Sequence, residues 1–254
     1  MQPILVAILK CNQYGLRILR AFHIFAQKIF RMKIGALITG DIVDSTKMAA
    51  EERNTMLYVL QSLPEMLLPL TKINLEIFRG DSFQIKVEDA VRSLSAALSI
   101  RAHIRSFKFA GCNHQWDARL AIGIGTLDYE NETLGMSDGE AYRASGRGLD
   151  SIGKARLLIE TPWEEVNEEL SVSTAFADNI ISQWTQSQSR VLFQSLINKN
   201  LSHAEIGNML GISRQMVDKS IRTGKEGLIR MYVNRFEELI RERLKSFALS
   251  TRFL

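Results

Sequence analysis

The chain has 254 residues, of which 46% are hydrophobic and 24% are charged, and its formal net charge is +4. This composition is typical of a globular protein with one sizeable core and a smaller second domain, and it excludes a disordered chain. The two cysteines, Cys11 and Cys112, lie far apart, and the four histidines are scattered. This spacing disfavours a disulfide framework and a zinc site, and it predicts a soluble protein of the reducing cytoplasm.

The first 31 residues differ from the rest because they contain Lys and Arg but no Asp or Glu. They hold no apolar run of the ~20 residues that a membrane-spanning helix needs. Two interpretations remain open. The segment can form a basic amphipathic helix that contacts a membrane surface, with one apolar face made of Leu16, Leu19, Phe22, Ile29 and Phe30. It can also be an extension in front of a domain that begins at Met32, which the start of an ordered pattern at that residue favours.

The segment from residue 33 to residue 160 is expected to form a sheet with helices. The first half should contain a buried strand at 33–42, a helix at 48–70 that Pro64 and Pro69 bend or divide, and a hairpin at 75–87. An amphipathic helix is expected at 89–107, with four residues inward: Val91, Leu94, Leu98 and Ile104. A strand at 118–124, a short helix after a polar loop, and a brief strand at 157–160 follow. This order is that of a ferredoxin-like sheet with helices on one face. We therefore predict an α+β domain over residues 32–165, with the acidic stretch 164–169 at its edge.

Two Gly-Asp pairs mark turns of the predicted sheet. Asp41 ends the first strand in GDIVDST, and Asp81 lies at the tip of the hairpin in FRGDSF. Because these turns are neighbours in the predicted sheet, the two carboxylates are expected to converge on Mg²⁺ or Mn²⁺, which in turn holds a nucleoside triphosphate. Taken singly, each Gly-Asp also fits an ordinary turn. The loop after the first strand would offer backbone N–H groups to the phosphates, from Val43, Asp44, Ser45 and Thr46.

These motifs resemble those of a known family. GDIVDST and RGDSFQIKV resemble the two metal-binding turns of class III adenylyl and guanylyl cyclases, RLAIGIG resembles the strand that follows, and GEAYRASGR resembles the segment with their catalytic Asn and Arg. The resemblance implies that Asp41 and Asp81 bind the metal and that Arg147 stabilises the transition state. Arg143 stands at the position of the catalytic Asn, and Ile77 at that of the base-reading lysine. The stretch SDGEAYRASGR also resembles the SatD-like proteins, a cyclase-related group.

The departures from the cyclase pattern disfavour cyclisation. Catalysis of this kind depends on positioning the triphosphate and neutralising developing charge, so the loss of one stabilising residue is a large loss. Arg143 and Arg147 nevertheless lie one helical turn apart and would form a clamp for an anion. We therefore expect a sensor of a nucleotide or phosphate. An active metal-dependent cyclase and a domain that only dimerises are the alternatives.

The stretch LSHAEIGNMLGISRQMVDKS predicts a helix-turn-helix. Ser202 with Glu205 three residues later is the capping box that begins a helix. Gly207 is small where the second helix must cross, Gly211 takes the positive φ of the turn, and Ser213 caps the second helix. The expected inward residues are Ile206, Met209 and Leu210 on the first helix and Met216, Val217 and Ile221 on the second.

The outward face of the predicted second helix suits DNA. Arg and Gln pair bidentately with guanine and adenine in the major groove, and Lys and Arg bind phosphates. The expected DNA-contacting residues are Arg214, Gln215, Asp218, Lys219, Arg222 and Lys225. Residues 183–229 resemble the DNA-reading module of sigma factors and LuxR-type regulators, which implies that SRQMV opens the recognition helix. The alternative is a helical hairpin that contacts a protein.

Residues 171–254 are expected to form this helical domain. From Leu228 to Leu244 the pattern continues as a long charged helix. Its apolar seam can pair two subunits or lie on the α+β domain of residues 32–165. The sequence as a whole predicts a transcriptional regulator. Its expected partners are double-stranded DNA, a nucleotide or second messenger, and a second copy of the chain.

Overall fold

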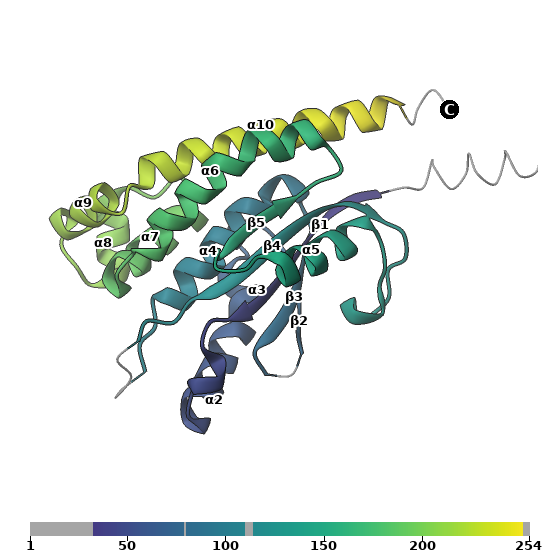
Figure 1. Cartoon of the computed structure of the whole chain (residues 1–254). Helices are drawn as coiled ribbons and strands as arrows, with labels where there is room; N and C mark the ends of the chain where they lie inside the picture. Colours follow the sequence, from purple (N-terminus) through teal and green to yellow (C-terminus); the bar gives the residue numbers. More distant parts are fainter. Residues whose placement is uncertain (1–32, 79, 110–113, 251–254) are drawn as a thin grey trace, which may run out of the picture. The chain divides into compact units, whose positions relative to one another are not determined.

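The computed structural model describes residues 33–78, 80–109 and 114–250. The N-terminal extension predicted for residues 1–31 lies outside the described residues, as do both cysteines. Residues 34–241 form one compact unit, and the last helix continues beyond it to Ser250. This unit confirms an α+β protein, because a mixed five-stranded sheet with helices is followed by an all-helical region (Figure 1).

The sheet has the strand order β2-β3-β1-β4-β5. β2 and β3 form the predicted hairpin, with Gly80 at a φ of 83° in its turn. β3 pairs antiparallel with β1, where Asp41 lies opposite Ser82, and β4 pairs parallel with β5. Each predicted strand is therefore confirmed: β1 (Lys33–Ile42), β2 (Ile73–Phe78), β3 (Ser82–Val87), β4 (Ala118–Leu127) and β5 (Leu157–Glu160).

Helices cover both faces of the sheet at β4, not one face as expected. On one face lies α5 (Glu140–Ser151), so close that a Cβ placed on Gly123 would be 2.3 Å from the Ala141 carbonyl oxygen. The alternate residues of β4 point to the other face and are fully buried where α4 (Ser93–Arg105) contacts the strand: Leu120, Ile122 and Ile124. α2 (Ala50–Gln61) contacts α4, and the short α3 (Leu63–Met66) follows it with Pro64 in its first turn, so the predicted helix is divided near this proline as expected.

Helix α4 is buried on every side. All 13 of its residues are buried, including Arg101 and His103, so the prediction of an amphipathic helix with one inward face is wrong. One side of α4 packs on the sheet, and the other packs on α7 (Gln186–Ile197), where the His103 ring lies 4.8 Å from the Phe193 ring. No side of the helix is left for solvent, because the helical region covers the side that the sequence pattern assigned to water.

The helical region consists of α6 (Glu164–Ser182), α7, α8 (His203–Leu210), α9 (Arg214–Thr223) and α10 (Glu226–Ser250). The acidic stretch 164–169, which was expected at the edge of the sheet domain, forms the first turns of α6. Acidic side chains are favourable there because a helix N-terminus carries partial positive charge. α6 and α10 run side by side (Figure 1), joined by a hydrogen bond of 2.6 Å between the hydroxyls of Thr174 and Tyr232. No helix in the described ranges is long and apolar enough to span a bilayer.

Glu237 of α10 ties the helical region to the sheet region. Its carboxylate accepts hydrogen bonds from Arg92 at 2.7 Å, from Ser95 at 3.2 Å and from Lys199 at 3.0 Å. α10 thus contacts the sheet region through Glu237, while the predicted seam residue Tyr232 bonds to Thr174 of α6. Leu228, expected in that seam, is 55% exposed.

A cluster of five charged side chains, called here the arginine cluster, joins α4 and α6 to the starts of β4 and β5. Arg101 donates to both carboxylate oxygens of Asp117, at 3.0 and 2.9 Å, and to Asp178 at 2.7 Å. Arg105 and Arg156 also donate to Asp117, at 2.8 and 2.7 Å. Burial alone would raise the pKa of Asp117, but these guanidinium groups hold it below its ordinary value.

Candidate functional site

The turn between α8 and α9 has the geometry that the sequence predicts. The capping box is confirmed, because the Ser202 hydroxyl accepts from the Glu205 N–H at 3.3 Å and the Glu205 carboxylate accepts from the Ser202 N–H at 2.7 Å. Gly211 ends α8 in the left-handed region, at a φ of 68°. A Cβ on Gly207 would lie 2.7 Å from the Ile212 carbonyl oxygen, so the chain crosses α8 at a distance that only glycine allows.

Helix α9 is held to the protein along a narrow strip. The Ser213 hydroxyl caps it by accepting from the Met216 N–H at 3.3 Å. Val217 is the one residue of α9 that is buried, and it packs against Val191 and Ile206. The prediction that Met216 faces inward is wrong, since its side chain is 54% exposed. The same holds for Met209 on α8, which is 58% exposed.

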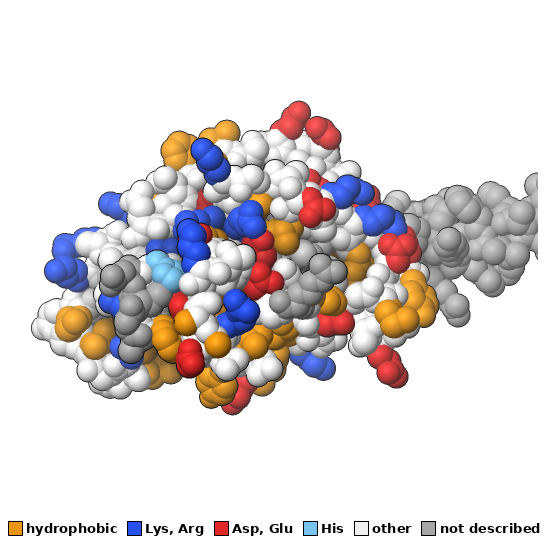
Figure 2. All heavy atoms as spheres, turned by 60° about the horizontal axis from the view of Figure 1, so that its bottom comes forward, with side chains coloured by type: hydrophobic (Ala, Val, Ile, Leu, Met, Phe, Trp, Pro, Cys, Tyr) orange, Lys and Arg blue, Asp and Glu red, His pale blue; other side chains and the backbone are white. Residues whose placement is uncertain are grey.

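The narrow attachment leaves a broad basic face on α9. Arg214, Gln215, Lys219 and Arg222 are exposed, and Lys225 follows them at the joint with α10. Figure 2 shows basic side chains at the end where Figure 1 places α8 and α9. No acidic side chain of a described residue is visible at that end in this view. This face therefore suits an anionic partner.

Asp218 is the one acidic residue among those expected to contact DNA. Its carboxylate is hydrogen-bonded to the imidazole of His203 on α8, and the guanidinium of Arg214 lies 3.8 Å away. The carboxylate therefore has its own partners on the protein. The carboxylate lies one helical turn from Arg214, at a spacing that restrains a long basic side chain. A contact between Asp218 and DNA stays a prediction.

The two aspartate turns of the sheet lie side by side, as expected, but each carboxylate has a protein partner. The guanidinium of Arg119 on β4 donates to both oxygens of Asp41, from Nε at 2.9 Å and from Nη2. The Ser45 hydroxyl donates to Asp81 at 2.7 Å. Within the described ranges, no group of three or more His, Cys, Asp or Glu residues could hold a metal ion. In this arrangement the two aspartates do not fit Mg²⁺ or Mn²⁺ unless Arg119 moves away.

The loop after β1 uses part of its backbone internally. The Val43 N–H donates to the Asp117 carbonyl oxygen at 3.0 Å, so this amide is engaged and does not face a phosphate. Asp44 has a φ of 58° and accepts from the Lys47 ammonium at 2.7 Å, which lowers the pKa of its carboxyl group. Ser45 and Thr46 complete the predicted phosphate loop, and the Ser45 hydroxyl is the one bound to Asp81.

The two arginines expected to form an anion clamp differ in their surroundings. Arg143 donates to Asp138 at 2.6 Å and to Asp128 at 3.2 Å. These contacts raise the pKa of its guanidinium, and the hydrogen bond to Asp128 makes the largest contribution. Arg147 is exposed, and no contact joins its guanidinium to another described polar group. Arg147 alone is therefore available for an anion in this arrangement.

Sequence reasoning missed Arg119 and the arginine cluster. Arg119 alternates with the apolar residues of its strand, which could have indicated a side chain on the same face as Asp41. The cluster had no such signal, because the arginines of α4 find their carboxylates on distant segments, before β4 and on α6. The sequence matches no protein-family model, and no similar curated protein was found for it.

Proposed function

We propose that this protein binds double-stranded DNA through a helix-turn-helix formed by α8 and α9. The observation that supports this proposal best is the position of Val217. It anchors α9 on one side and leaves Arg214, Gln215, Lys219 and Arg222 together on the exposed side. A helix held in this way can enter the major groove without unpacking from its neighbours.

The order of the exposed residues along α9 agrees with this role. Arg214 and Gln215 form its first turn, and the N-terminal residues of a recognition helix are those that reach base edges. Lys219, Arg222 and Lys225 follow toward its end, where they would bind phosphates on the wall of the groove. Charge on Arg and Lys supports binding to DNA in general, and the first turn would supply the preference for sequence.

For residues 33–160, which contain the sheet, we propose a cyclase-like domain that senses a ligand and does not catalyse cyclisation. The strand order β2-β3-β1-β4, with α2 and α4 on one face, supports a ferredoxin-like arrangement. The Asp41–Arg119 pair disfavours the cyclase alternative, since the charge that would bind a metal is already balanced. A divalent ion at Asp41 and Asp81 stays a prediction that requires this pair to open. A second copy of the chain as partner also stays a prediction.

DNA binding is tested by selection from random duplexes with the full chain, followed by fluorescence anisotropy on the enriched duplex. We expect one sequence family to be enriched and a Kd that weakens steeply as salt rises. Lys219→Glu with Arg222→Glu should abolish binding to any duplex. Arg235→Glu on α10 is the matched control and should bind normally, because Arg235 is a basic residue away from α9 that pairs with Glu169. No enrichment, with equal behaviour of all variants, would favour the protein-contact alternative.

A further inference from the structure

A groove of about 620 Å³ lies between β5 and α6, away from both the aspartate turns and α9. We propose that it binds a small organic anion with a flat apolar body and one phosphate or carboxylate group. The volume falls in the range of small-molecule sites. The proposal does not depend on DNA binding.

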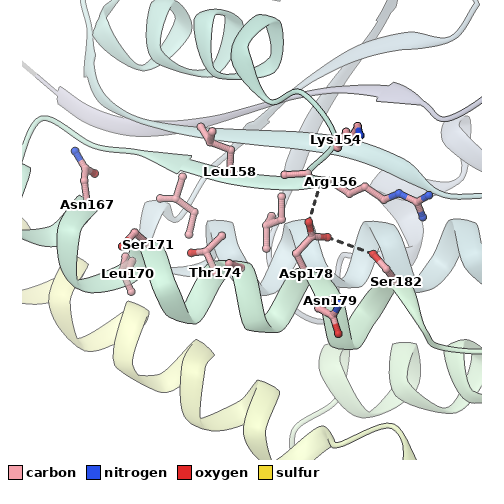
Figure 3. Close-up of a pocket in the computed structure, with 14 residues that line it drawn as sticks. Lys154, Arg156, Leu158, Asn167, Leu170, Ser171, Thr174, Asp178, Asn179 and Ser182 are labelled. Atoms are coloured by element: carbon pink, nitrogen blue, oxygen red, sulfur yellow. Dashed lines mark hydrogen bonds between the residues drawn. The ribbon is translucent and has the colours of Figure 1, made fainter.

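Two hydrogen-bonded contacts hold α6 against the two ends of β5 and leave the groove between them. At one end the side-chain amide of Asn167 bonds to both backbone groups of Thr161, each at 2.9 Å. At the other end the Arg156 N–H donates to Asp178 at 2.8 Å. Figure 3 shows Asn167 at one end and Asp178, Arg156 and Lys154 at the other. The groove is thus held open by a fixed frame.

Apolar side chains line the middle of the groove from both β5 and α6. Leu157 and Ile159 of β5 lie opposite Leu120 and Ile122 in the strand register, so their side chains lie on the face of the sheet that α4 covers. Leu170 and Ala175 line the groove from α6, beside the hydroxyl-bearing Ser171 and Thr174 (Figure 3). These side chains can cover both sides of a flat apolar group, and burial of such a group is favourable in proportion to the area removed from water.

The end of the groove at Arg156 carries an excess of positive charge. The arginine cluster contains three guanidinium groups and two carboxylates, Asp117 and Asp178. Arg156 is its most accessible member, with 34% of its side chain exposed, and it lines the groove. Lys154 lines the same end and has no hydrogen bond or ion pair with a described residue. An anion here would balance charge that the cluster leaves uncompensated.

An added peptide strand fits this edge of the sheet less well than a small molecule. A strand pairing with β5 would have to displace Asn167 from both backbone groups of Thr161 and Asp178 from the amide of Arg156. What remains between these contacts is shorter than a typical strand. A compact ligand needs neither contact to break.

Calorimetric titration of the full chain with three matched probes tests the proposal: 2-naphthyl phosphate, 2-naphthoate and neutral 2-naphthol. We expect at least one anion to bind at least tenfold more tightly than 2-naphthol. Binding of the phosphate alone or of the carboxylate alone identifies the anionic group. Equal affinity for all three, or binding of none, would overturn the proposal.

Substitutions in the groove test whether the probe binds there. Ala175→Trp should abolish binding because the indole fills the groove, whereas Val172→Trp is the control, since Val172 is exposed on α6 and does not line the groove. Ser171→Trp, which also lines the groove, replaces Ala175→Trp if circular dichroism shows that variant unfolded. Lys154→Ala should weaken anion binding about tenfold, or ~1.4 kcal/mol, and leave 2-naphthol unchanged. Unchanged anion binding in the groove-filling variant would exclude this site, and DNA binding would be unaffected by that result.

Discussion

At Asp41, the charge that would attract a cation is already balanced by Arg119, whose guanidinium spans both carboxylate oxygens. Removing that guanidinium should uncover a carboxylate beside Asp81. We predict that Mn²⁺ raises the melting temperature of Arg119→Ala by about 3–5 °C at roughly ten times its Kd and leaves the wild type unchanged. Differential scanning calorimetry measures this. The gain should vanish in Arg119→Ala with Asp81→Asn. A wild type that Mn²⁺ stabilises equally would mean that Arg119 leaves Asp41 readily.

Single side chains on α9 should separate base reading from phosphate binding. We predict that Arg214→Ala and Gln215→Ala each cost roughly 1–3 kcal/mol on the selected duplex and little on random DNA. Arg222→Ala should weaken both duplexes alike and make the salt slope shallower by about one unit. Salt titrations by fluorescence anisotropy give both quantities. Equal losses for all three variants on both duplexes would contradict the assignment of roles.

His103 should make stability depend on pH in a defined window. Burial lowers the pKa of its imidazole from 6.5 to about 4. Between these values the unfolded chain takes up a proton that the folded protein does not, so stability falls as the pH falls from 6.5 to 4, by up to about 3 kcal/mol. About one pH unit above 6.5 the ring is neutral in both states and contributes no slope.

We predict that His103→Gln loses this part of the pH dependence. The measurement is the free energy of unfolding in urea for both proteins between pH 4.5 and pH 7.5. Carboxylates such as Asp117 titrate in both proteins, so the difference between the two curves isolates the imidazole. Parallel curves over the whole range would show that the folded protein protonates His103 at its ordinary pKa.

At the scale of elements, two glycines of the helix-turn-helix should respond differently to the same substitution. Gly207→Ala places a methyl group 2.7 Å from a backbone oxygen, so α8 and the turn must separate, at a cost of about 1–3 kcal/mol and with loss of DNA affinity. Gly211→Ala meets no atom within 4 Å but adopts a left-handed φ, which costs about 1 kcal/mol and keeps the helices in place.

Urea unfolding and anisotropy on the selected duplex measure both effects. Gly227→Ala is the control, because a Cβ there meets no atom within 4 Å and alanine favours a helix. That variant should be as stable as the wild type or slightly more stable, with unchanged DNA affinity. Normal DNA affinity of Gly207→Ala would show that the close crossing is not needed to present α9.

Elements with local chemical signals could be predicted from the sequence. The capping box at Ser202, the turn at Gly211 and the hairpin around Gly80 depend on residues a few positions apart, and all three are confirmed. The predictions of burial failed where segments distant in the sequence cover a side chain or leave it exposed. α4 looked amphipathic because its own pattern cannot report that α7 covers its second side. Met216 was expected inside because it is apolar, although Val217 and the partly buried Ile221 are the residues of α9 that pack against the helices beneath it.

At the scale of the whole molecule, the arginine cluster and Glu237 should make the sheet and the helices unfold together. Arg101 is fully buried and bonds to carboxylates before β4 and on α6. Trp116 reports on the sheet region and Trp184, whose indole donates to the Gly224 carbonyl oxygen at 2.8 Å, reports on the helical region. We predict that, in single-tryptophan variants that retain either residue, the fluorescence midpoint in urea agrees with the circular dichroism midpoint of the same variant within about 0.2 M.

Fluorescence of the two variants against urea, with circular dichroism as a common reference, gives the midpoints. Arg101→Met should lower both midpoints together, since it leaves Asp117 and Asp178 without their shared partner, a loss of about 3–5 kcal/mol. Separate transitions, with Trp184 losing its signal first, would show that the helical region unfolds independently of the sheet.

The burial of α4 on both sides limits how this chain can be cut. A fragment that stops at residue 165, where the sequence pattern places a domain boundary, would lose α7 and α10 and expose the ring of His103. It would also leave Arg101 without Asp178 on α6, and Arg105 without the carbonyl oxygens of Ser182 and Trp184. Such a fragment should aggregate when expressed alone, and so should the helices without α4. A recombinant protein meant for crystallisation or for ligand screening should therefore contain at least residues 34–241, and tags or fusions belong at its ends.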